Sequence, residues 1–310
     1  MASNKIALIT GVTGFIGRYI ARHFSEQGWS VIGIGTSPPE NAPLANLTKY
    51  YCLRLPDLYL HEILQLHYPS ICIHCAGRAS VGLSVSEPGS DFYTNSVVTF
   101  ELLNSLRLHT PNCKFIFLSS AAVYGNPQSL PINETQTVAP ISPYGFHKLM
   151  CEQMCLEFTK VYGLPTASMR IFSAYGPGLR RQVVWDICQK AIIKGSLLLQ
   201  GTGEESRDFI HALDIARALS VVVKSAPMEG EVYNLGSGRE VKISELATIV
   251  LNSLEENLTL QFDGIVPLGN PLNWQADIYK LKSIGFIPTV ELERGIKTFV
   301  NWCRAELVGV

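Results

Sequence analysis

The stretch Lys5–Gly17 (KIALITGVTGFIG) decides the fold of this chain. A short apolar run with β-branched residues, Ile6–Thr10, is followed at once by closely spaced glycines and then by a helical pattern over Phe15–Gln27. In such a strand–turn–helix unit, exposed backbone amides and the helix dipole stabilise a bound pyrophosphate, and small residues let the backbone approach it. The alternative is an ordinary glycine-rich turn. We predict a dinucleotide site, formed by Gly11, Thr13, Gly14, Phe15, Ile16 and Gly17.

The same alternation of short strands and longer helices continues to about residue 172. Further strands are predicted at Val31–Ile34, Tyr50–Arg54, Ser70–Ala76, Lys114–Ser119 and Thr166–Ile171. Long helical patterns lie at Asp91–Leu108 and Pro143–Tyr162. This rhythm is typical of a parallel sheet covered on both faces by helices, so we predict an α/β fold with a doubly wound, Rossmann-like sheet.

Beyond residue 172 the rhythm loosens into segments that contain proline and glycine, separated by helical patterns near 182–194, 212–224, 244–254 and 291–305. We expect a dinucleotide-binding domain over residues 1–172, with a return segment near 207–240. Residues 173–206 and 241–310 would form a smaller, mostly helical substrate-binding region.

The charge balance excludes some classes of partner. The chain has 25 basic and 26 acidic side chains, a formal net charge of −1, so no global field attracts nucleic acid or an anionic membrane. The first strand-like run begins at Lys5, and no apolar run reaches the length of about 18 residues that a membrane-spanning helix needs. We therefore expect a cytoplasmic protein that binds neither nucleic acid nor membrane.

The eight cysteines mostly lie inside apolar runs rather than at regular loop spacings. This distribution is typical of reduced thiols in a cytosolic protein. Cys72 and Cys75 form a C-x-x-C pair, but no second pair completes a zinc site, so we interpret them as core residues. His74, His147 and His211 share no metal spacing; we place them in a strand interior, on an exposed helix face and at a strand end. We expect no metal.

The end of the second strand bears on the choice of dinucleotide. A carboxylate there normally accepts hydrogen bonds from the ribose of NAD, but here the strand ends in Gly33–Ser37 (GIGTS), and the first acid is Glu40. We expect NADP or NAD and slightly favour NADP, with Thr36 and Ser37 as donors to its 2′-phosphate. A cationic clamp would have to come from Arg18 or from more distant residues.

Asp57 and Leu58 follow the third predicted strand and are candidates for contact with the adenine. The alternative for Asp57 is a solvated carboxylate that stabilises a turn.

The segment Ser142–Lys148 (SPYGFHK) carries the strongest catalytic signal. Ser142 suits a helix N-cap and Pro143 the first helical position, so Tyr144 and Lys148 lie four residues apart on one helix face. An ammonium beside a phenol favours phenolate, which can take a proton from a sugar hydroxyl as hydride leaves. The alternative is a surface pair.

Phe115–Gly125 (FIFLSSAAVYG) ends a predicted strand in two serines, at the edge where parallel sheets normally form their sites. Ser120 can hydrogen-bond the substrate oxygen on which Tyr144 acts. The alternative is that both serines satisfy local backbone groups.

Together these motifs resemble the NAD-dependent epimerase/dehydratase family of extended short-chain dehydrogenases. The resemblance spans nearly the whole chain and also rests on His74–Val81 (HCAGRASV), Asn95, Arg170–Gly178 (RIFSAYGPG), Arg207–His211 (RDFIH) and Tyr233–Gly238 (YNLGSG). It implies a nucleotide diphosphate sugar as substrate. It also implies a homodimer that pairs the helices Asp91–Leu108 and Pro143–Tyr162 with their copies.

The resemblance assigns roles residue by residue. The catalytic residues would be Ser120, Tyr144 and Lys148. The cofactor would also contact Ala76, Gly77, Asn95, Ser119, Tyr144, Lys148 and Phe172. The substrate would contact Ser80, Val81, Ser120, Ser173 and Arg207, the last at the diphosphate, a role that suits a bidentate guanidinium. Without the resemblance, Arg207 and Asp208 would read as a loop ion pair, and Arg170 as a structural charge at a strand end.

Departures from the family pattern narrow the reaction. Dehydratases and decarboxylases similar to this family carry acidic residues where this chain has Ala121 and Ala122, so both reactions are disfavoured. We expect an epimerase that acts through a transient ketone at carbon 4. The alternatives are an NADPH-dependent reductase of a nucleotide 4-keto-6-deoxysugar and a non-catalytic dinucleotide-sensing scaffold. Ser173 and Asn273 depart from common family residues and leave the exact substrate open.

Overall fold

A seven-stranded parallel sheet forms the centre of the molecule in the computed structural model, which describes residues 5–41, 45–194, 197–256, 258–265 and 271–309. The strand order is β3-β2-β1-β4-β5-β6-β11, and every neighbouring pair is parallel. This confirms the predicted doubly wound fold, because the order reverses between β1 and β4, where such sheets form their ligand crevice. The strands are β1 (Ile6–Thr10), β2 (Ser30–Gly35), β3 (Lys49–Cys52), β4 (Ile71–His74), β5 (Lys114–Ser120), β6 (Thr166–Ile171) and β11 (Glu229–Leu235).

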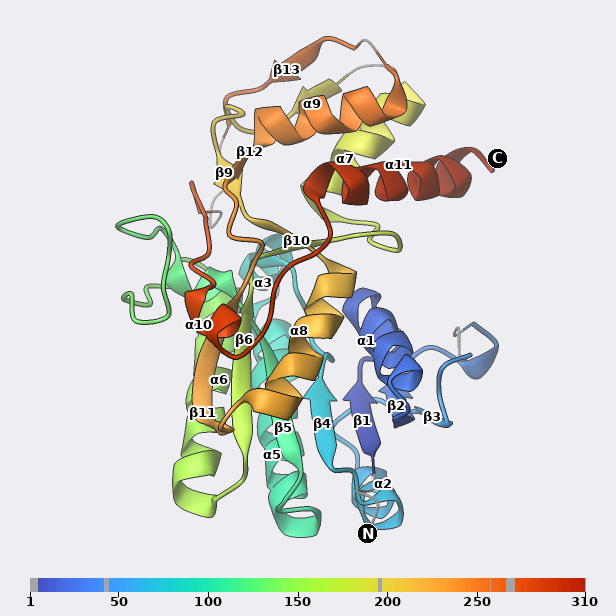
Figure 1. Ribbon diagram of the computed structural model, residues 1–310, viewed down its shortest axis with the longest axis vertical. Coiled ribbons are helices and arrows are strands. Elements are labelled where there is room, and N and C mark those ends of the chain that lie inside the picture. The colour runs from blue at the N-terminus through green and yellow to red at the C-terminus, as the bar shows by residue number, and fades with distance from the viewer. Residues whose placement is uncertain (1–4, 42–44, 195–196, 257, 266–270, 310) are drawn as a thin grey trace.

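Helices cover both faces of this sheet (Figure 1). One face packs against α1 (Phe15–Glu26) and α8 (Ala212–Ser225), through a core that includes Ile20, Phe24 and Leu219. The other packs against α2 (Tyr59–His67), α5 (Val98–His109) and α6 (Pro143–Tyr162). The strands carry apolar side chains on both faces, so both faces of the sheet have to be covered by helices.

The predicted helix Asp91–Leu108 differs from the structure in its first half. It consists of α4 (Pro88–Phe92), a π-helical turn η2 (Tyr93–Val97) and α5. A short helix α3 (Val81–Ser86) precedes it. Wide turns of this kind often occur at functional sites, and this one carries Asn95, which is buried.

A smaller part of the molecule lies beyond the carboxyl edge of the sheet (Figure 1). Its core is formed mainly by α7 (Gln182–Gln189), α9 (Ile243–Leu254) and α11 (Leu292–Val308). The π-helical turn η4 (Lys190–Lys194) follows α7, whereas α10 (Tyr279–Ser283) packs against β11 of the large sheet. Short strand pairs complete the smaller part: β7 (Ser173–Tyr175) with β10 (Phe209–His211), β8 (Leu197–Leu199) with β13 (Leu260–Phe262), and β9 (Ser206–Arg207) with β12 (Val241–Lys242).

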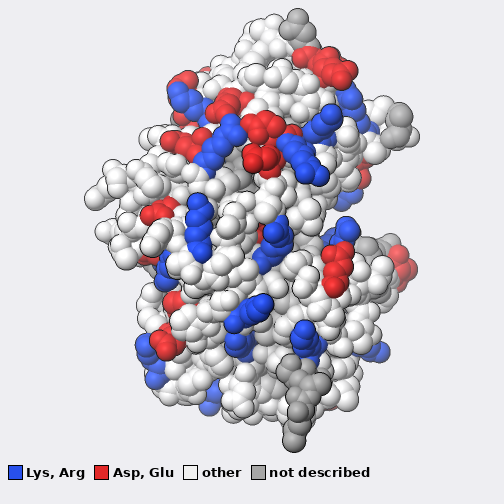
Figure 2. All heavy atoms as spheres, viewed as in Figure 1, with Lys and Arg blue, Asp and Glu red and all other residues white. Residues whose placement is uncertain are grey.

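Charged side chains of both signs alternate on the face seen in Figure 2, most densely over the smaller part. Arg239, which follows β11, lies 2.6 Å from Glu245 on α9 and 2.8 Å from Glu293 on α11. No broad field of one sign appears on this face. None of the helices in the described ranges is long and apolar enough to cross a membrane.

Candidate active site

The glycine-rich turn between β1 and α1 brings backbone close to backbone. Gly11 has φ +66°, and a Cβ built on it would lie 2.7 Å from the amide nitrogen of Ala76. A Cβ on Gly17 would contact the carbonyl oxygen of Gly11. Gly14 precedes α1 without a side-chain cap, so among the described residues no side chain accepts a hydrogen bond from the first-turn amides of α1. These amides form a cradle of the kind that binds a phosphate.

The residues after β2 lie beside this turn. Ser37 Oγ donates to Thr13 Oγ1 at 3.3 Å, and Tyr50 Oη donates to the Ser37 carbonyl at 2.5 Å. Thr36 is exposed. Arg18 Nε donates to the Thr13 carbonyl at 2.8 Å, so its guanidinium reaches the loop, as a cationic clamp would require.

Asp57 and Leu58 lie between β3 and α2. The Asp57 carboxylate accepts the Tyr59 amide at 2.9 Å, which is the turn contact given as the alternative in the sequence analysis. Leu58 is 82% exposed. Contact of either residue with an adenine remains a prediction.

The loop after β4 meets the π-helical turn and the start of α6. Gly77 has φ +144°, and a Cβ on it would lie 2.7 Å from Asn95 Oδ1 and 4.0 Å from Lys148 Nζ. Asn95 Oδ1 is buried and has no hydrogen-bond partner among the described residues. The Ala76 amide donates to Thr10 Oγ1 at 3.3 Å. Asn95 Oδ1 is thus an acceptor without a partner within the described ranges, and it lies beside Gly77, where any larger residue would intrude. This arrangement fits the polar groups of a dinucleotide, as do the amides at the start of α1.

His74 lies beneath this loop and links three elements. Its Nδ1 lies 2.7 Å from Thr10 Oγ1, and its Nε2 lies 3.2 Å from Thr99 Oγ1. Burial, and to a smaller extent the charge of Lys148, lower the pKa of His74 from 6.5 to about 3. His74 is therefore neutral at physiological pH and cross-links β1, β4 and α5 without adding charge.

The first turn of α6 carries the predicted catalytic pair. Ser142 caps the helix by accepting the Gly145 amide at 3.2 Å, with Pro143 at the first helical position, as predicted. Tyr144 is 8% exposed and Lys148 6%. Lys148 Nζ donates to the Leu118 carbonyl at 2.9 Å and lies 5.8 Å from the centroid of the Tyr144 ring. The ammonium is thus held in place beside the phenol.

Ser120 ends β5 next to this turn. Its hydroxyl accepts the Ala122 amide at 3.2 Å and caps the short helix η3 (Ala121–Tyr124). A Cβ on Gly145 would lie 2.6 Å from the Ala122 carbonyl, so a glycine is required for α6 to pack this closely. The same packing puts Tyr144 in one apolar cluster with Ala121 and Ala122. Ser120 is half-buried, and its hydroxyl still has a proton to donate.

A buried ion pair supports the site from behind. Arg170 Nη2 lies 2.7 Å from Glu152 Oε2, and Ser119 Oγ donates to Glu152 Oε1 at 2.5 Å. Burial opposes the charge of Arg170, but hydrogen bonds and the charge of Glu152 outweigh it and raise the pKa of Arg170. Arg170 Nη1 also donates to Tyr124 Oη, whose pKa burial raises to about 12. Arg170 is therefore a structural charge at the end of a strand, which is the alternative that the residues alone suggested. The Ser119 hydroxyl belongs to the same network.

The substrate residues expected beyond β6 lie near one another. Ser173 begins β7, and its amide donates to the Asp208 carbonyl at 2.8 Å. Arg207 lies with its guanidinium 5.4 Å from the Trp274 ring centroid and donates to the carbonyls of Ser206 and Leu272. Phe172 packs edge-on against Trp274 at 6.1 Å.

Arg207 does not form the ion pair with Asp208 that a loop reading would predict. The Asp208 carboxylate instead accepts the amides of Ser237, Gly238 and Ala276. Burial lowers the pKa of Arg207 to about 10, although Glu205 acts in the opposite direction. A guanidinium with no carboxylate bonded to it in the described part of the chain is suited to an anionic ligand.

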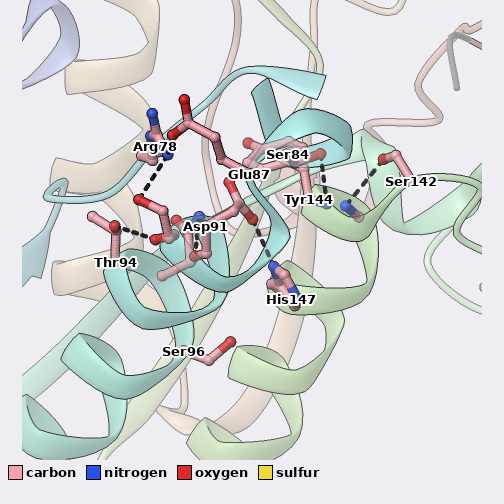
Figure 3. Close-up of polar contacts among 12 residues, drawn as sticks. Arg78, Ser84, Glu87, Asp91, Thr94, Ser96, Ser142, Tyr144 and His147 are labelled. Atoms are coloured by element: carbon pink, nitrogen blue, oxygen red, sulfur yellow. Dashed lines mark hydrogen bonds and ion pairs between the residues drawn. The ribbon is translucent and has the colours of Figure 1, made fainter. Parts of the chain in front are cut away.

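The contacts between α3, α4 and α6 could not be predicted from the sequence (Figure 3). Ser80 caps α3, where Val81 begins, and Ser84 on the same helix accepts the Tyr144 amide at 3.1 Å. His147 is buried rather than exposed, because α4 packs against α6, and its Nδ1 lies 2.6 Å from Asp91 Oδ2. Residue spacing could not indicate these pairs, since about sixty residues separate the partners.

The described residues hold no group of three or more histidine, cysteine or acidic side chains placed to bind a metal ion. All eight cysteines are free thiols. Burial raises the pKa of Cys72 and Cys155 well above the usual range, so these thiols behave as core residues.

A model of the NAD dependent epimerase/dehydratase family matches residues 7–236. The chain belongs to this family. The putative UDP-glucose 4-epimerase of Methanocaldococcus jannaschii is 29% identical over 96% of this chain and 98% of its own length. Both the family model and the sheet order agree with the resemblance stated from the motifs.

Solved family members have the same architecture. The UDP-N-acetylglucosamine 4-epimerase of Methanobrevibacter ruminantium, in complex with UDP-N-acetylmuramic acid, superposes with a TM-score of 0.88 at 29% identity, covering 98% of this chain and 99% of that one. The UDP-glucose 4-epimerase of Thermus thermophilus in complex with NAD gives 0.88 at 26% identity, covering 97% and 100%.

Proposed function

We propose that the protein is an NAD(P)-dependent epimerase that inverts carbon 4 of a nucleoside diphosphate sugar through a transient ketone. The observation that carries this proposal is the placement of Tyr144 and Lys148 at the start of α6, next to Gly77 and the unfilled Asn95 Oδ1. Similar proteins named as 4-epimerases support the reaction, and their names support a UDP-sugar as the substrate.

The side chains divide the proton chemistry among them. Tyr144 takes the proton from the hydroxyl at carbon 4 and returns it when the ketone is reduced on its other face. Lys148, fixed by the Leu118 carbonyl, holds its ammonium beside the Tyr144 ring. Ser120 orients the substrate oxygen by donating its hydroxyl proton to it in a hydrogen bond. The bound dinucleotide supplies the acceptor, and then the donor, of hydride.

Two buried alanines restrict the reaction. Ala121 and Ala122 lie beside Tyr144 in the apolar cluster and offer no proton to a departing hydroxyl. This supports epimerisation over dehydration, which needs a general acid.

Arg207 is proposed to bind the diphosphate, since its fork of donors matches phosphate oxygens. Ser80, Val81 and Ser173 are proposed to contact the sugar, and we assign substrate binding to residues 173–206 and 241–310. The dinucleotide would lie against residues 1–172, with the return segment near 207–240. Free thiols favour a cytoplasmic location.

The preference for NADP over NAD remains a prediction. It rests on the absence of an acid at the end of β2 and on Arg18 at the glycine turn. NAD is supported by the family and by relatives solved with NAD. An epimerase returns its cofactor to the starting state, so it does not need the reduced NADP pool on which a reductase depends.

We also propose that the protein is a homodimer. The helices α4, η2, α5 and α6 expose large apolar side chains, which a second copy would cover: Phe92, Tyr93, Phe100, Phe146 and Met150. Sedimentation analysis should show that Phe146→Arg is monomeric, whereas Leu66→Arg on α2, where the leucine is 72% exposed, leaves the dimer intact. A monomeric parent protein would refute the proposal.

The direct test is to titrate the protein with NADH and NADPH in parallel, and then to offer it a panel of UDP-hexoses and nucleotide 4-keto sugars. Interconversion of two hexoses without net change in reduced nicotinamide absorbance would establish an epimerase. Stoichiometric loss of that absorbance with a keto sugar would establish a reductase instead. Tyr144→Phe should lose activity while its dinucleotide affinity persists, and dinucleotide binding without turnover of any sugar would favour the scaffold.

A further inference from the structure

The amide of Tyr144 is capped by a residue from outside its own helix. Pro143 has no amide hydrogen, and Ser142 caps the amide of Gly145, so Tyr144 holds the remaining donor at the start of the first turn. That amide donates to Ser84 Oγ at 3.1 Å. Ser84 is completely buried and donates its own proton to the Val81 carbonyl at 2.7 Å. The hydroxyl therefore joins α3 to the catalytic residue of α6.

A second contact joins α4 to the same turn of α6 (Figure 3). Asp91 is 1% exposed, and its Oδ2 lies 2.6 Å from His147 Nδ1, while its Oδ1 has no partner among the described residues. A buried carboxylate with a single partner depends strongly on that partner. His147 immediately precedes Lys148 and packs edge-on against Phe92 at 5.4 Å.

The segment between these contacts also touches the rest of the site. It begins at Val81, next to Ser80, both proposed to contact the sugar, and the Asp91 carbonyl accepts Asn95 Nδ2 at 3.2 Å. Arg78, which precedes the segment, binds it at two points: it donates to Glu87 Oε2 at 2.8 Å and to Ser90 Oγ at 2.9 Å.

We propose that the segment Val81–Phe92 positions the catalytic tyrosine, because Ser84 holds the Tyr144 backbone and Asp91 holds His147, which together fix the first turn of α6 against the sugar-binding residues. This inference rests on the proposed function. It makes Ser84, Asp91 and His147 positioning residues, which do not touch the reacting atoms. They fix where the Tyr144 oxygen lies relative to a substrate held at Ser80 and Val81.

The first test compares Ser84→Ala with Ser86→Ala. Ser86 lies on the same helix and is exposed, and its hydroxyl donates to the Leu83 carbonyl within α3. Loss of the cap should lower the kcat of Ser84→Ala about tenfold, with unchanged KM and dinucleotide affinity, because a small displacement penalises the reacting geometry more than binding. Ser86→Ala should match the parent protein in all three quantities.

The second test is a double-mutant cycle of Asp91→Ala and His147→Ala. The double variant should be about as slow as the slower single variant, because both substitutions remove the same contact. His147→Asn, which can place an amide donor near Nδ1, should recover part of the lost kcat. If the two effects simply add, or if His147→Asn and His147→Ala are equally slow, Asp91 and His147 do not act as a pair and the inference fails.

A third readout does not depend on the reaction. Hydrogen exchange of the Tyr144 amide, measured in the cofactor-free protein by NMR, should be about tenfold faster in Ser84→Ala than in the parent, whereas Ser86→Ala leaves it unchanged. Unchanged exchange in Ser84→Ala, or a lowered Tm with an unchanged kcat, would overturn the inference. If no hexose is converted by the parent protein while the exchange responds as expected, the proposed reaction fails and the contact to Tyr144 stands.

Discussion

Acidification should destabilise the protein through His74. This side chain is 1% exposed and bonded on both ring nitrogens, to Thr10 and Thr99. Burial and then Lys148 lower its pKa from 6.5 to about 3 in the folded state. Between the two pKa values His74 is protonated in the unfolded chain but not in the folded one. The free energy of unfolding therefore decreases as the pH falls from the unfolded pKa toward the folded pKa.

The size of the effect follows from the width of that window. Between about pH 7 and pH 5 the unfolded imidazole becomes charged while the folded one stays neutral. Since each unit of pH within the window is worth about 1.4 kcal/mol, His74 alone should lower the free energy of unfolding by about 2 kcal/mol over this range. The loss should continue down to the folded pKa of about 3.

The assay is urea unfolding of the parent protein and of His74→Asn at both pH values. Asparagine keeps polar atoms at the site but does not titrate, so the variant should lose about 2 kcal/mol less than the parent on acidification, whatever its stability at neutral pH. Other histidines with lowered pKa values, such as His23 and His67, are present in both proteins and cancel. An equal loss in the two proteins would refute the reasoning.

Three substitutions test other parts of the site. Gly17→Ala would force its Cβ against the Gly11 carbonyl, shifting the first turn of α1, so dinucleotide affinity measured by calorimetry should fall about tenfold through lost amide–phosphate bonds. Arg207→Lys keeps the charge but loses the fork, so the KM for the nucleotide sugar should rise about tenfold while dinucleotide affinity is unchanged. Glu152→Leu leaves Arg170 buried without its partner, so the free energy of unfolding in urea should fall by about 3 to 5 kcal/mol.

Two of these substitutions, Gly17→Ala and Glu152→Leu, have a matched control. Gly89→Ala places a methyl group where no atom lies within 4 Å, and dinucleotide affinity should not change. The exposed pair of Arg22 and Glu26 should contribute less than about 1 kcal/mol when Glu26 is replaced by Leu. Equal effects of test and control would show that contact geometry does not govern these losses. If Arg207→Lys instead raised the KM for the dinucleotide, the proposed contact of Arg207 with the sugar diphosphate would be wrong.

The sequence was sufficient for elements whose local signals agree with the final packing. The pattern over Pro143–Tyr162 predicts α6 to the residue, because an N-cap serine, a proline at the first position and a glycine after the last all indicate the same ends. The strands β1 and β6 also match their predicted bounds, and nearly all of their residues are buried.

The missed elements are those whose character depends on distant partners. The strand β11 (EGEVYNL) was not predicted, because its first residues are acidic or glycine and its pairing with β6 supplies what its composition lacks. The smaller part was expected to be mostly helical, yet it includes strands as short as two residues that only tertiary contacts can define.

The same limit applies to the site. The residues of each motif, such as Tyr144 and Lys148, could be paired by helix spacing. Glu152 lies four residues beyond Lys148, so that spacing could have indicated a third member of this face. No spacing links His147 to Asp91, and the helix pattern alone left His147 on an exposed face because it does not show which neighbour will cover it.

The π-helical turn at Tyr93–Val97 lets α4 and α5 each keep the face that it buries, which one regular α-helix could not do. Deleting one residue from it would rotate α5 against α4 by about 100°. Either Leu102 and Leu106 would turn out of the core, or Asn95 would turn away from Gly77 and Lys148. A one-residue difference in length at this point in a related chain therefore indicates an altered reaction centre, whereas the same difference in a surface loop would be of little consequence.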